Sequence, residues 1–471
     1  MTITVPWTDR KLQNADPALP ESGVTEARLL GSDMGALAAR LDLIASATHT
    51  VDIQYYYWAN DLSGRFLMAA ALSAADKGIK VRILLDDLNA GGLDRHFAAL
   101  DAHPGISVRL FNPLRFRFNG LARLVALLST FVTANNRMHN KNLVIDRSHA
   151  IVGGRNLGDP YFGLDHGTNF HDIDMHVSGK AAREAAGIFD TYWTATASRR
   201  VSRVIGRSPR RLGRLRAHLR QLEQTVEAQD LLQRLAAFRK DGPPVTLQQV
   251  EQIAVAADPP SKAVLRERKD WLGPRIEALI ESAQREVLLF SPYLVPGKSG
   301  CELLKRTAAR GVQVKVLTNS LAATDVVIAH SGYARYRRPL LEAGVGIYEQ
   351  PARLTRERMH VFGSRKASLH TKSVLVDGQK GFVGSFNFDP RSKSINTEMG
   401  VFFDDARLGG RLHEELQGNL NQCLRVSLNQ GALVWHNATG VVVSRDAEPL
   451  ASPGQRIVAT IAGLLPLESQ L

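Results

Sequence analysis

The chain has 471 residues, 44% of them hydrophobic, which is enough for two packed domains, and it carries a formal net charge of +13. This charge attracts densely negative partners, either nucleic acid or an anionic lipid surface, and does not choose between them. The two cysteines, Cys301 and Cys423, are too few for a disulfide framework or a cysteine-based zinc site, which favours a reducing compartment.

The expected N-terminal extension, residues 1–25, has no apolar stretch behind a basic start, so it does not resemble a secretory signal. No window of about 18 nearly uncharged apolar residues occurs along the sequence, and we therefore expect no transmembrane helix. Attachment to a membrane would then have to occur at its surface.

The first expected domain, residues 26–198, opens with a strand, a helix and a second strand. Residues 49–58 and 79–87 are rich in apolar and β-branched side chains. The stretch between them has a helical pattern that stops at Gly78, a typical helix C-cap. This order is typical of a parallel α/β unit.

Residues 113–137 combine Arg115, Arg117 and Arg123 with phenylalanine, leucine and valine. This composition is typical of a helix that lies in a membrane interface. A helix in the protein core is the alternative.

A motif of polar residues follows this segment. His139 is followed by Lys141 two residues later, Asp146 seven later, Gly153 fourteen later and Asn156 seventeen later. These residue types are able to bind a phosphate group and to move a proton.

An expected connector, residues 199–260, begins with a segment that is dense in arginine and interrupted by glycine and proline, 199–220. A solvated charged face and contact with an anionic surface explain this segment equally well.

The second expected domain, residues 261–435, repeats the order of the first. A strand at 285–293, a helix that stops at Gly311 and a strand at 312–318 precede a second motif, which begins at His370. The later residues of this motif keep the spacings of the first copy: Lys372, Asp377, Gly384 and Asn387. Two copies that share all of these spacings indicate a duplicated α/β domain.

The spacing within each motif indicates which side chains act together. On a strand, residues two apart point to the same side, so each half presents one imidazole beside one ammonium group. Asp146 and Asp377 stand an odd number of residues from their histidines and would face the other way. We therefore expect structural roles for these two aspartates.

If the two halves meet around a pseudo-twofold axis, one phosphodiester can contact both motifs. Its oxygens would be bound by the two lysines and by Asn156 and Asn387, and no metal ion or other cofactor is needed. One histidine would attack phosphorus and form a phosphohistidine, while the other protonates the leaving oxygen.

A catalytic imidazole also needs a carboxylate on its second nitrogen. The sequence N-T-E-M-G-V after the second motif aligns with D-I-D-M-H-V after the first. We therefore expect Glu398 to orient His370, and Asp174 to orient His139. Asp172 and a neighbouring histidine adjoin Asp174, and they could take the same role or none.

The paired H-x-K-x4-D motifs, followed by G-G-R-N and G-S-F-N, resemble the signature of the phospholipase D (PLD) superfamily. The resemblance implies two PLD-like α/β domains, each a mixed sheet flanked by helices, packed as a pseudo-twofold pair with one shared, metal-independent active site. It also implies a phosphohistidine intermediate. The functional set that it implies is His139, Lys141, Asp146, His370, Lys372 and Asp377. The first motif carries Gly154 where the second carries Ser385, which leaves one half without this hydroxyl.

Further segments, such as Q-Y-Y-Y-W-A-N-D from Gln54 and S-F-N-F-D-P-R-S from Ser385, are similar to the bacterial cardiolipin synthases of the C type. This resemblance implies transfer of a phosphatidyl group to phosphatidylglycerol, from phosphatidylethanolamine or a second phosphatidylglycerol. It also implies a peripheral position on the cytoplasmic side of the bacterial inner membrane. The C-terminal tail, 436–471, is a candidate for contact with that anionic surface, because its end is rich in apolar residues.

Two alternatives remain open. The first is a PLD-type phosphodiesterase that hydrolyses phospholipid or nucleic acid. Aromatic residues are not interleaved with the basic segment 199–220, so nucleic acid is not the expected partner. The second is a catalytically inactive membrane-binding protein, although both copies of the motif keep histidine, lysine and asparagine.

Overall fold

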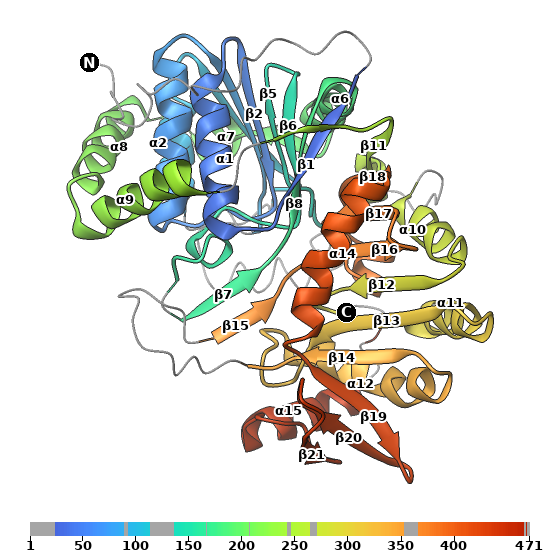
Figure 1. Cartoon of the computed structure of the whole chain (residues 1–471). Helices are drawn as coiled ribbons and strands as arrows, with labels where there is room; N and C mark the ends of the chain where they lie inside the picture. Colours follow the sequence, from blue (N-terminus) through green and yellow to red (C-terminus); the bar gives the residue numbers. More distant parts are fainter. Residues whose placement is uncertain are drawn as a thin grey trace.

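The computed structural model of the chain describes residues 24–88, 93–113, 136–165, 167–206, 208–242, 246–263, 271–352, 366–465 and 468. Two lobes are arranged one above the other in Figure 1, and each is built around a large mixed sheet. The predicted interfacial helix at 113–137 lies outside the described residues apart from its ends.

The first lobe contains a nine-stranded sheet with the order β10-β1-β8-β6-β5-β2-β3-β4-β9. Its strands are β1 (Glu26–Leu30), β2 (Thr50–Tyr55), β3 (Lys80–Asp86), β4 (Ile106–Phe111), β5 (Asn142–Ile145), β6 (His149–Gly153), β8 (Asp174–Ser178), β9 (Ser198–Arg200) and β10 (Gln248–Gln249). Its helices are α1 (Asp33–Ser46), α2 (Leu62–Asp76), α3 (Asp94–Leu100), η1 (Asp159–Tyr161), α6 (Gly179–Thr194), α7 (Val201–Val204), α8 (Pro209–Leu222) and α9 (Val226–Asp241).

The second lobe contains a ten-stranded sheet with the order β11-β18-β17-β16-β12-β13-β14-β19-β20-β21. Its strands are β11 (Gln252–Ala257), β12 (Glu286–Phe290), β13 (Gln313–Asn319), β14 (Gly346–Gln350), β16 (Ser373–Val376), β17 (Lys380–Gly384), β18 (Met399–Asp404), β19 (Leu424–Asn429), β20 (Ala432–His436) and β21 (Val442–Arg445). Its helices are η2 (Pro260–Ala263), α10 (Leu272–Glu281), α11 (Gly297–Ala309), α12 (Val327–Glu342), α13 (Pro390–Ser394), α14 (Ala406–Leu420) and α15 (Pro453–Leu464).

The two sheets share one strand order, which confirms the predicted duplication. The series β1-β8-β6-β5-β2-β3-β4-β9 corresponds strand for strand to β11-β18-β17-β16-β12-β13-β14-β19. The directions correspond as well, because β2 and β3 pair in parallel, as do β12 and β13, while β5 and β16 run antiparallel to their neighbours.

The predicted strand–helix–strand units form as the pattern indicates. Helix α2 and helix α11 each end one residue before a C-cap that is followed by a glycine with positive φ, Gly78 at 89° and Gly311 at 85°. Glycine has no Cβ to oppose this left-handed conformation, so the chain can turn directly into the next parallel strand.

The expected connector and tail contain regular elements, and the connector joins the two lobes. The segment 199–260 starts in β9 of the first sheet, continues through α8 and α9, which pack on helices of the first lobe, and ends in β11 of the second sheet. The tail supplies β21 to the second sheet, and α15 packs on α12. The domain boundaries themselves stay predictions.

An apolar core holds the lobes together. It unites Val144 and Met175 of the first sheet with Leu288 and Val401 of the second, all fully buried. Helix α6 packs against β11 of the other lobe, and α14 packs in the same way against β1. A separate two-stranded parallel sheet, β7 (Thr168–His171) with β15 (Lys366–Leu369), also joins the halves (Figure 1).

No helix among the described residues is both long enough and apolar enough to cross a bilayer.

Candidate active site

Each histidine lies on extended chain that leads directly into a central strand of its own sheet. His139 and Lys141 precede β5, and His370 and Lys372 precede β16. All four side chains are largely buried, with the two lysines 1% exposed. Both motifs therefore lie inside the protein, at the starts of the corresponding strands β5 and β16.

Backbone hydrogen bonds join each motif to the opposite half. The His139 N–H donates to the carbonyl of Thr397 over 2.8 Å, and the His370 N–H donates to the carbonyl of His171 over 2.8 Å. Met138 and Thr397 also form an isolated parallel bridge. The two motifs thus meet at the boundary between the lobes.

The residue after each of these carbonyls is a buried carboxylate that orients the histidine. Nδ1 of His139 lies 2.8 Å from Oε2 of Glu398, and Nδ1 of His370 lies 2.5 Å from Oδ2 of Asp172. Both carboxylates are 0% exposed. Each imidazole is therefore positioned by a carboxylate from the other half of the chain, which leaves its Nε2 for substrate.

The predicted assignment of these carboxylates was wrong in both halves. Glu398 orients His139 and not His370, and Asp172, not Asp174, orients His370. The sheet register gives the reason, because Gly153 pairs with Asp174 whereas Gly384 pairs with Gly400. Asp172 is thus the counterpart of Glu398, two residues from the position that the motif alignment suggested.

Asp174 has a different partner set. Its Oδ2 accepts from Arg40 over 2.9 Å and from Arg155 over 3.2 Å, and all three side chains are buried. Removal of one member of such a buried ionic group leaves the others unpaired, which is costly. Asp174 therefore holds β8 and α1 in place behind the site.

The difference between Gly154 and Ser385 matches the different lengths of the two carboxylates. Ser385 Oγ donates to Oε2 of Glu398 over 2.5 Å, and Ser392 Oγ donates to Oε1 over 2.7 Å. At Gly154, a Cβ atom would lie 2.3 Å from Oδ1 of Asp172. The space of a side chain in one half is thus occupied by the shorter carboxylate in the other.

The lysine ammonium groups are buried beside the histidine backbone. Lys141 Nζ donates to the His139 carbonyl over 2.7 Å, and Lys372 Nζ donates to the His370 carbonyl. Burial lowers the pKa of Lys372 to about 8, and burial lowers the pKa of Lys141 well below its ordinary value. The negative charge of Glu398 acts in the opposite direction and raises the pKa of both lysines. The charged groups of the two motifs therefore influence one another.

Burial favours the neutral form of both imidazoles. Burial lowers the pKa of His139 to about 4, despite the opposing charge of Glu398. Burial also lowers the pKa of His370 well below its ordinary value, and the charges of Lys372 and Lys141 act in the same direction. A neutral imidazole whose Nδ1–H points to a carboxylate presents a lone pair at Nε2, as a nucleophile requires.

The two asparagines are both linked to site residues, and the Asn387 N–H donates to Ser392 Oγ, which in turn donates to Glu398. Asn156 Nδ2 donates to Tyr161 Oη over 2.8 Å, and the Tyr161 ring packs edge-on against His370 at 5.1 Å. The Oδ1 atoms of Asn156 and Asn387 are buried and have no hydrogen-bond partner among the described residues. Polar atoms buried in this way usually interact with a ligand or a bound water.

Asp146 and Asp377 lie at the far ends of β5 and β16, away from the histidines. The Asp146 carboxylate accepts from the N–H groups of 48–50, and Asp377 accepts from those of 284–286. Burial opposes ionisation, but these donors hold the pKa of each aspartate below its usual value. The contacts agree with the expected structural role, since each carboxylate fixes the start of β2 or β12.

No group of three or more histidine, cysteine, aspartate or glutamate side chains in the described part of the chain could hold a metal ion.

The comparisons with known proteins agree with this geometry. Residues 41–193 and 276–423 match the family described as "Cardiolipin synthase, PLD-like domain". The Cardiolipin synthase C of Escherichia coli (strain K12) is 35% identical over 93% of this chain and 94% of its own length. A Cardiolipin synthase of Geobacillus sp. (strain WCH70) is 28% identical over 81% of this chain and 64% of its own length. The crystal structure of phosphatidylserine synthase from Haemophilus influenzae Rd KW20 has the same fold, with a TM-score of 0.61 at 14% identity, and covers 94% of this chain and 95% of its own.

Proposed function

Because the chain belongs to the cardiolipin synthase family with PLD-like domains, we propose that it is a phosphatidyltransferase that forms cardiolipin through a phosphohistidine intermediate. The observation that carries the proposal is the crossed arrangement of the site, in which each histidine is oriented by a carboxylate of the other half. Such a site is complete only when both motifs surround one phosphorus atom.

The chemistry follows from the state of each group. Nε2 of one neutral imidazole attacks the phosphorus of the donor lipid, and the bond to its headgroup oxygen breaks. The other imidazole takes up a proton when the negative phosphodiester binds beside it, and it delivers this proton to the leaving oxygen. It then removes the proton from a hydroxyl of phosphatidylglycerol, which attacks the phosphohistidine and releases cardiolipin. Lys141 and Lys372 stabilise the charge on the phosphoryl oxygens throughout.

We further propose phosphatidylethanolamine as the preferred donor over a second phosphatidylglycerol. Asp325 is exposed at the edge of the site and accepts from Tyr293 Oη over 2.8 Å. Its charge acts on Lys372 and on Tyr161, whose ring packs against His370. A carboxylate beside a phenol ring suits the ammonium group of ethanolamine, and it offers less to the neutral glycerol of phosphatidylglycerol.

The donor is tested with Asp325→Asn. The substitution should lower kcat/KM with phosphatidylethanolamine by about tenfold, since one charge-assisted hydrogen bond to the headgroup is lost. The value with phosphatidylglycerol alone should hardly change. Glu302→Gln, on the exposed face of α11, is the matched control. Equal losses with both donors would contradict headgroup recognition by Asp325.

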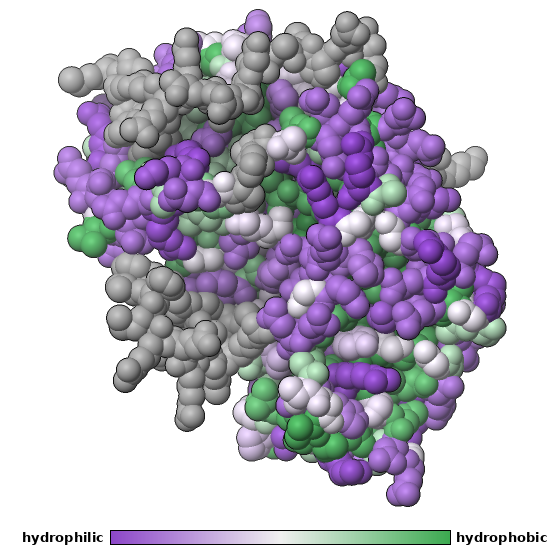
Figure 2. All heavy atoms as spheres, viewed as in Figure 1, coloured by the Kyte–Doolittle hydropathy of each residue, from purple (hydrophilic) through white to green (hydrophobic). Residues whose placement is uncertain are grey.

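We also propose that the protein is peripheral on the cytoplasmic face of the bacterial inner membrane and that α15 contacts the lipid. Helix α15 exposes Ile457, Val458, Ile461 and Leu464, which follow helical spacing, and Leu464 is 82% exposed. The valines at 441–443 are exposed near the same end of the lobe. Figure 2 shows a hydrophobic area at the lower end of the second lobe, where Figure 1 places α15 and β21. We name these residues of α15 and 441–443 the terminal apolar surface.

Vesicle binding tests this surface. Ile457→Ser with Ile461→Ser should weaken binding to phosphatidylglycerol vesicles by tenfold or more, because each isoleucine contributes roughly 1.5–3 kcal/mol when buried in lipid. Val226→Ser, at an exposed valine on α9, is the matched control. Unchanged binding of the double variant would exclude α15 as the contact.

The activity itself is tested with purified protein and labelled phosphatidylglycerol, with and without phosphatidylethanolamine. Cardiolipin should form in the presence of chelator and should disappear in His139→Ala and in His370→Ala. Plasmid DNA in a parallel reaction tests the nuclease alternative. Cleavage of DNA without cardiolipin, or a need for added divalent metal, would overturn the proposal.

A further inference from the structure

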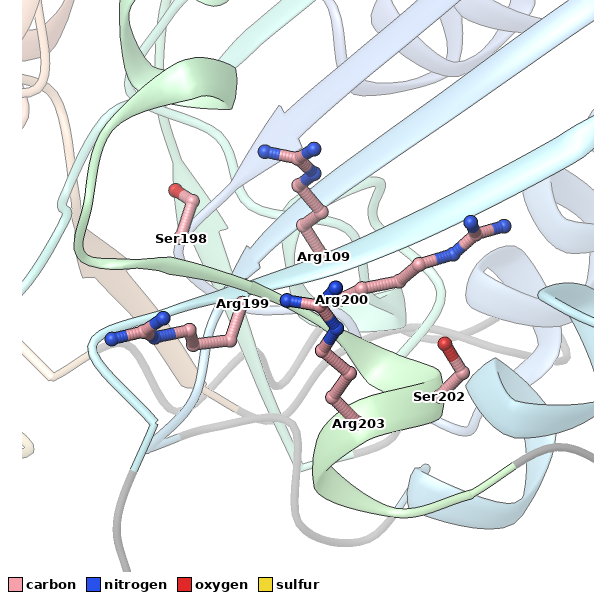
Figure 3. Close-up of a pocket in the computed structure, with 6 residues that line it drawn as sticks. All are labelled: Arg109, Ser198, Arg199, Arg200, Ser202 and Arg203. Carbon is pink, nitrogen blue, oxygen red and sulfur yellow. The ribbon is translucent and has the colours of Figure 1, made fainter.

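A second cationic site lies at the outer edge of the first lobe. A cavity of about 500 Å³ is lined there by four arginines and two serines. These side chains come from β4, β9 and α7, and Figure 3 shows Arg199 and Arg200 extending in opposite directions from β9. We name this set the arginine pocket: Arg109, Ser198, Arg199, Arg200, Ser202 and Arg203.

The sheet register and a tight connection build this pocket. Arg109 pairs with Arg200 across the antiparallel β4 and β9, so two arginines oppose each other at the sheet edge. Strand β9 then passes directly into α7, which brings Arg203 to the same hollow. Like charges placed opposite each other on neighbouring strands are destabilising unless an anion lies between them.

Arg109 is held in position without a carboxylate partner among the described residues. One of its guanidinium nitrogens donates to the Trp193 carbonyl, and its Cζ lies 4.7 Å above the Trp193 ring. Burial lowers the pKa of Arg109, and the nearby charges of Arg200 and Arg203 lower it further. The stacked guanidinium thus loses little freedom when it binds an anion.

The pocket carries more positive charge than its neighbours neutralise. Within the described part of the chain, its one ion pair joins Arg200 to Asp101 at 3.5 Å. Arg82, two strands from β9, shows the contrast, because it pairs with both Asp52 and Asp190. Carboxylates thus neutralise the charge of Arg82, whereas most of the charge of the pocket arginines remains available to bind an anion.

We propose that the arginine pocket binds a phosphate group and is a second anion site, separate from the histidines. Guanidinium forks bind phosphate oxygens well, and the Ser202 hydroxyl adds a neutral donor, whereas the Ser198 hydroxyl already donates to the Tyr192 carbonyl. Between β9 and β5 the sheet order places β4, β3 and β2, which corresponds to about 19 Å at the usual strand spacing. One phosphate cannot contact both sites.

The phosphate could be carried by the headgroup of an anionic phospholipid or by a soluble phosphate ester. Both present the same oxygens to the pocket, so the contacts do not differ. In the first case the pocket would hold a lipid that is not reacting, and in the second it would sense a metabolite.

Calorimetric titration of the full chain distinguishes these sources. One arm uses inorganic phosphate, and the other uses dihexanoyl phosphatidylglycerol below its micelle concentration. Wild type should bind the ligand of each arm at two sites. In the double variant Arg109→Gln with Arg203→Gln, binding at one of these sites should be at least tenfold weaker, so that only one site is detected. Loss in both arms identifies phosphate itself as the ligand, and loss in the lipid arm alone identifies the headgroup. Arg210→Gln with Arg214→Gln, on the exposed face of α8, removes the same charge elsewhere and should keep both sites.

Two results would overturn the proposal. One is a wild type with a single site that the pocket variant leaves unchanged. The other is loss of the second site in the α8 control as well, which would mean that net charge and not the pocket binds the anion. Thermal unfolding of each variant verifies that it is folded. Cardiolipin synthesis by the pocket variant is measured separately, and this activity shows whether the histidine site is still intact.

Discussion

Replacement of Glu398 by glutamine tests whether the orienting carboxylates are crossed between the lobes. The amide keeps the size of the side chain and removes the charge that His139 contacts at 2.8 Å. His139 gains positive charge when it attacks phosphorus or takes up a proton, and loss of the buried counter-charge then costs about 3–5 kcal/mol. If this cost falls on the transition state, kcat should drop by about 10² to 10⁴, since 1.36 kcal/mol corresponds to a factor of ten.

The assay combines turnover with proton NMR. A histidine Nδ1–H that donates to a carboxylate resonates far downfield, and the signals of His139 and His370 are assigned from His139→Gln and His370→Gln. Glu398→Gln should shift the His139 signal and leave the His370 signal in place. Asp172→Asn should do the reverse, because its carboxylate lies 2.5 Å from Nδ1 of His370.

The matched control is Glu349→Gln. Glu349 is also fully buried and accepts from Tyr333 and Trp435, away from both histidines. Its loss should lower stability and leave both downfield signals in place. A Glu398→Gln variant that shifts the His370 signal, or that keeps more than a tenth of wild-type kcat, would refute the crossed arrangement.

Three further outcomes follow from other contacts. Burial lowers the pKa of His139 from 6.5 to about 4, so as pH falls the imidazole is protonated in the unfolded chain before it is protonated in the folded protein. About 2 kcal/mol of the stability that is present above pH 6.5 should therefore be lost by pH 5. Urea unfolding measures this loss, which should be absent in His139→Gln. Asp146→Ala should lower the free energy of unfolding by about 2 kcal/mol, because three backbone N–H groups lose their acceptor, and a tenfold loss of kcat in the folded variant would contradict the structural role. Gly154→Ser should lower kcat by about a hundredfold, because its Cβ would lie 2.3 Å from Oδ1 of Asp172 and displace that carboxylate from His370. Steady-state kinetics measure this effect, and an unchanged kcat would contradict the steric account.

The fold could be predicted because its signal is repeated in the sequence. Two motifs with the same spacings, each behind a strand–helix–strand unit that ends in a capping glycine, indicate one α/β domain present twice. Periodicity fixes which faces are buried, and the C-cap glycines fix where the helices stop. Local physics is sufficient for these features.

The partners of the histidines could not be predicted by the same means. Asp172 and Asp174 both face the same side of an extended chain, so alternation does not distinguish them. The segment between β6 and β8 is longer than the one between β17 and β18. Equal sequence distance from the two motifs therefore does not identify the corresponding carboxylates. The contact that decides the pairing, between the Thr397 carbonyl and the His139 N–H, joins different lobes.

Other features depend on tertiary packing as well. The arginine-rich segment 199–220 has no period that shows β9 pairing with β4, so the arginine pocket could not be found from charge alone. The pairing of Arg40 and Arg155 with Asp174 is equally remote in sequence. Sequence patterns define elements, whereas sites between elements need the assembled structure.

Covalent labelling tests the central claim most directly, namely that both motifs act on one phosphorus atom. Enzyme quenched during turnover of a donor labelled in its phosphatidyl group should carry one label per chain, on either His139 or His370 but not on both. Alanine at either histidine should abolish cardiolipin synthesis. Two labelled histidines per chain, or about half of the wild-type turnover in each single-histidine variant, would show two independent sites and contradict the account.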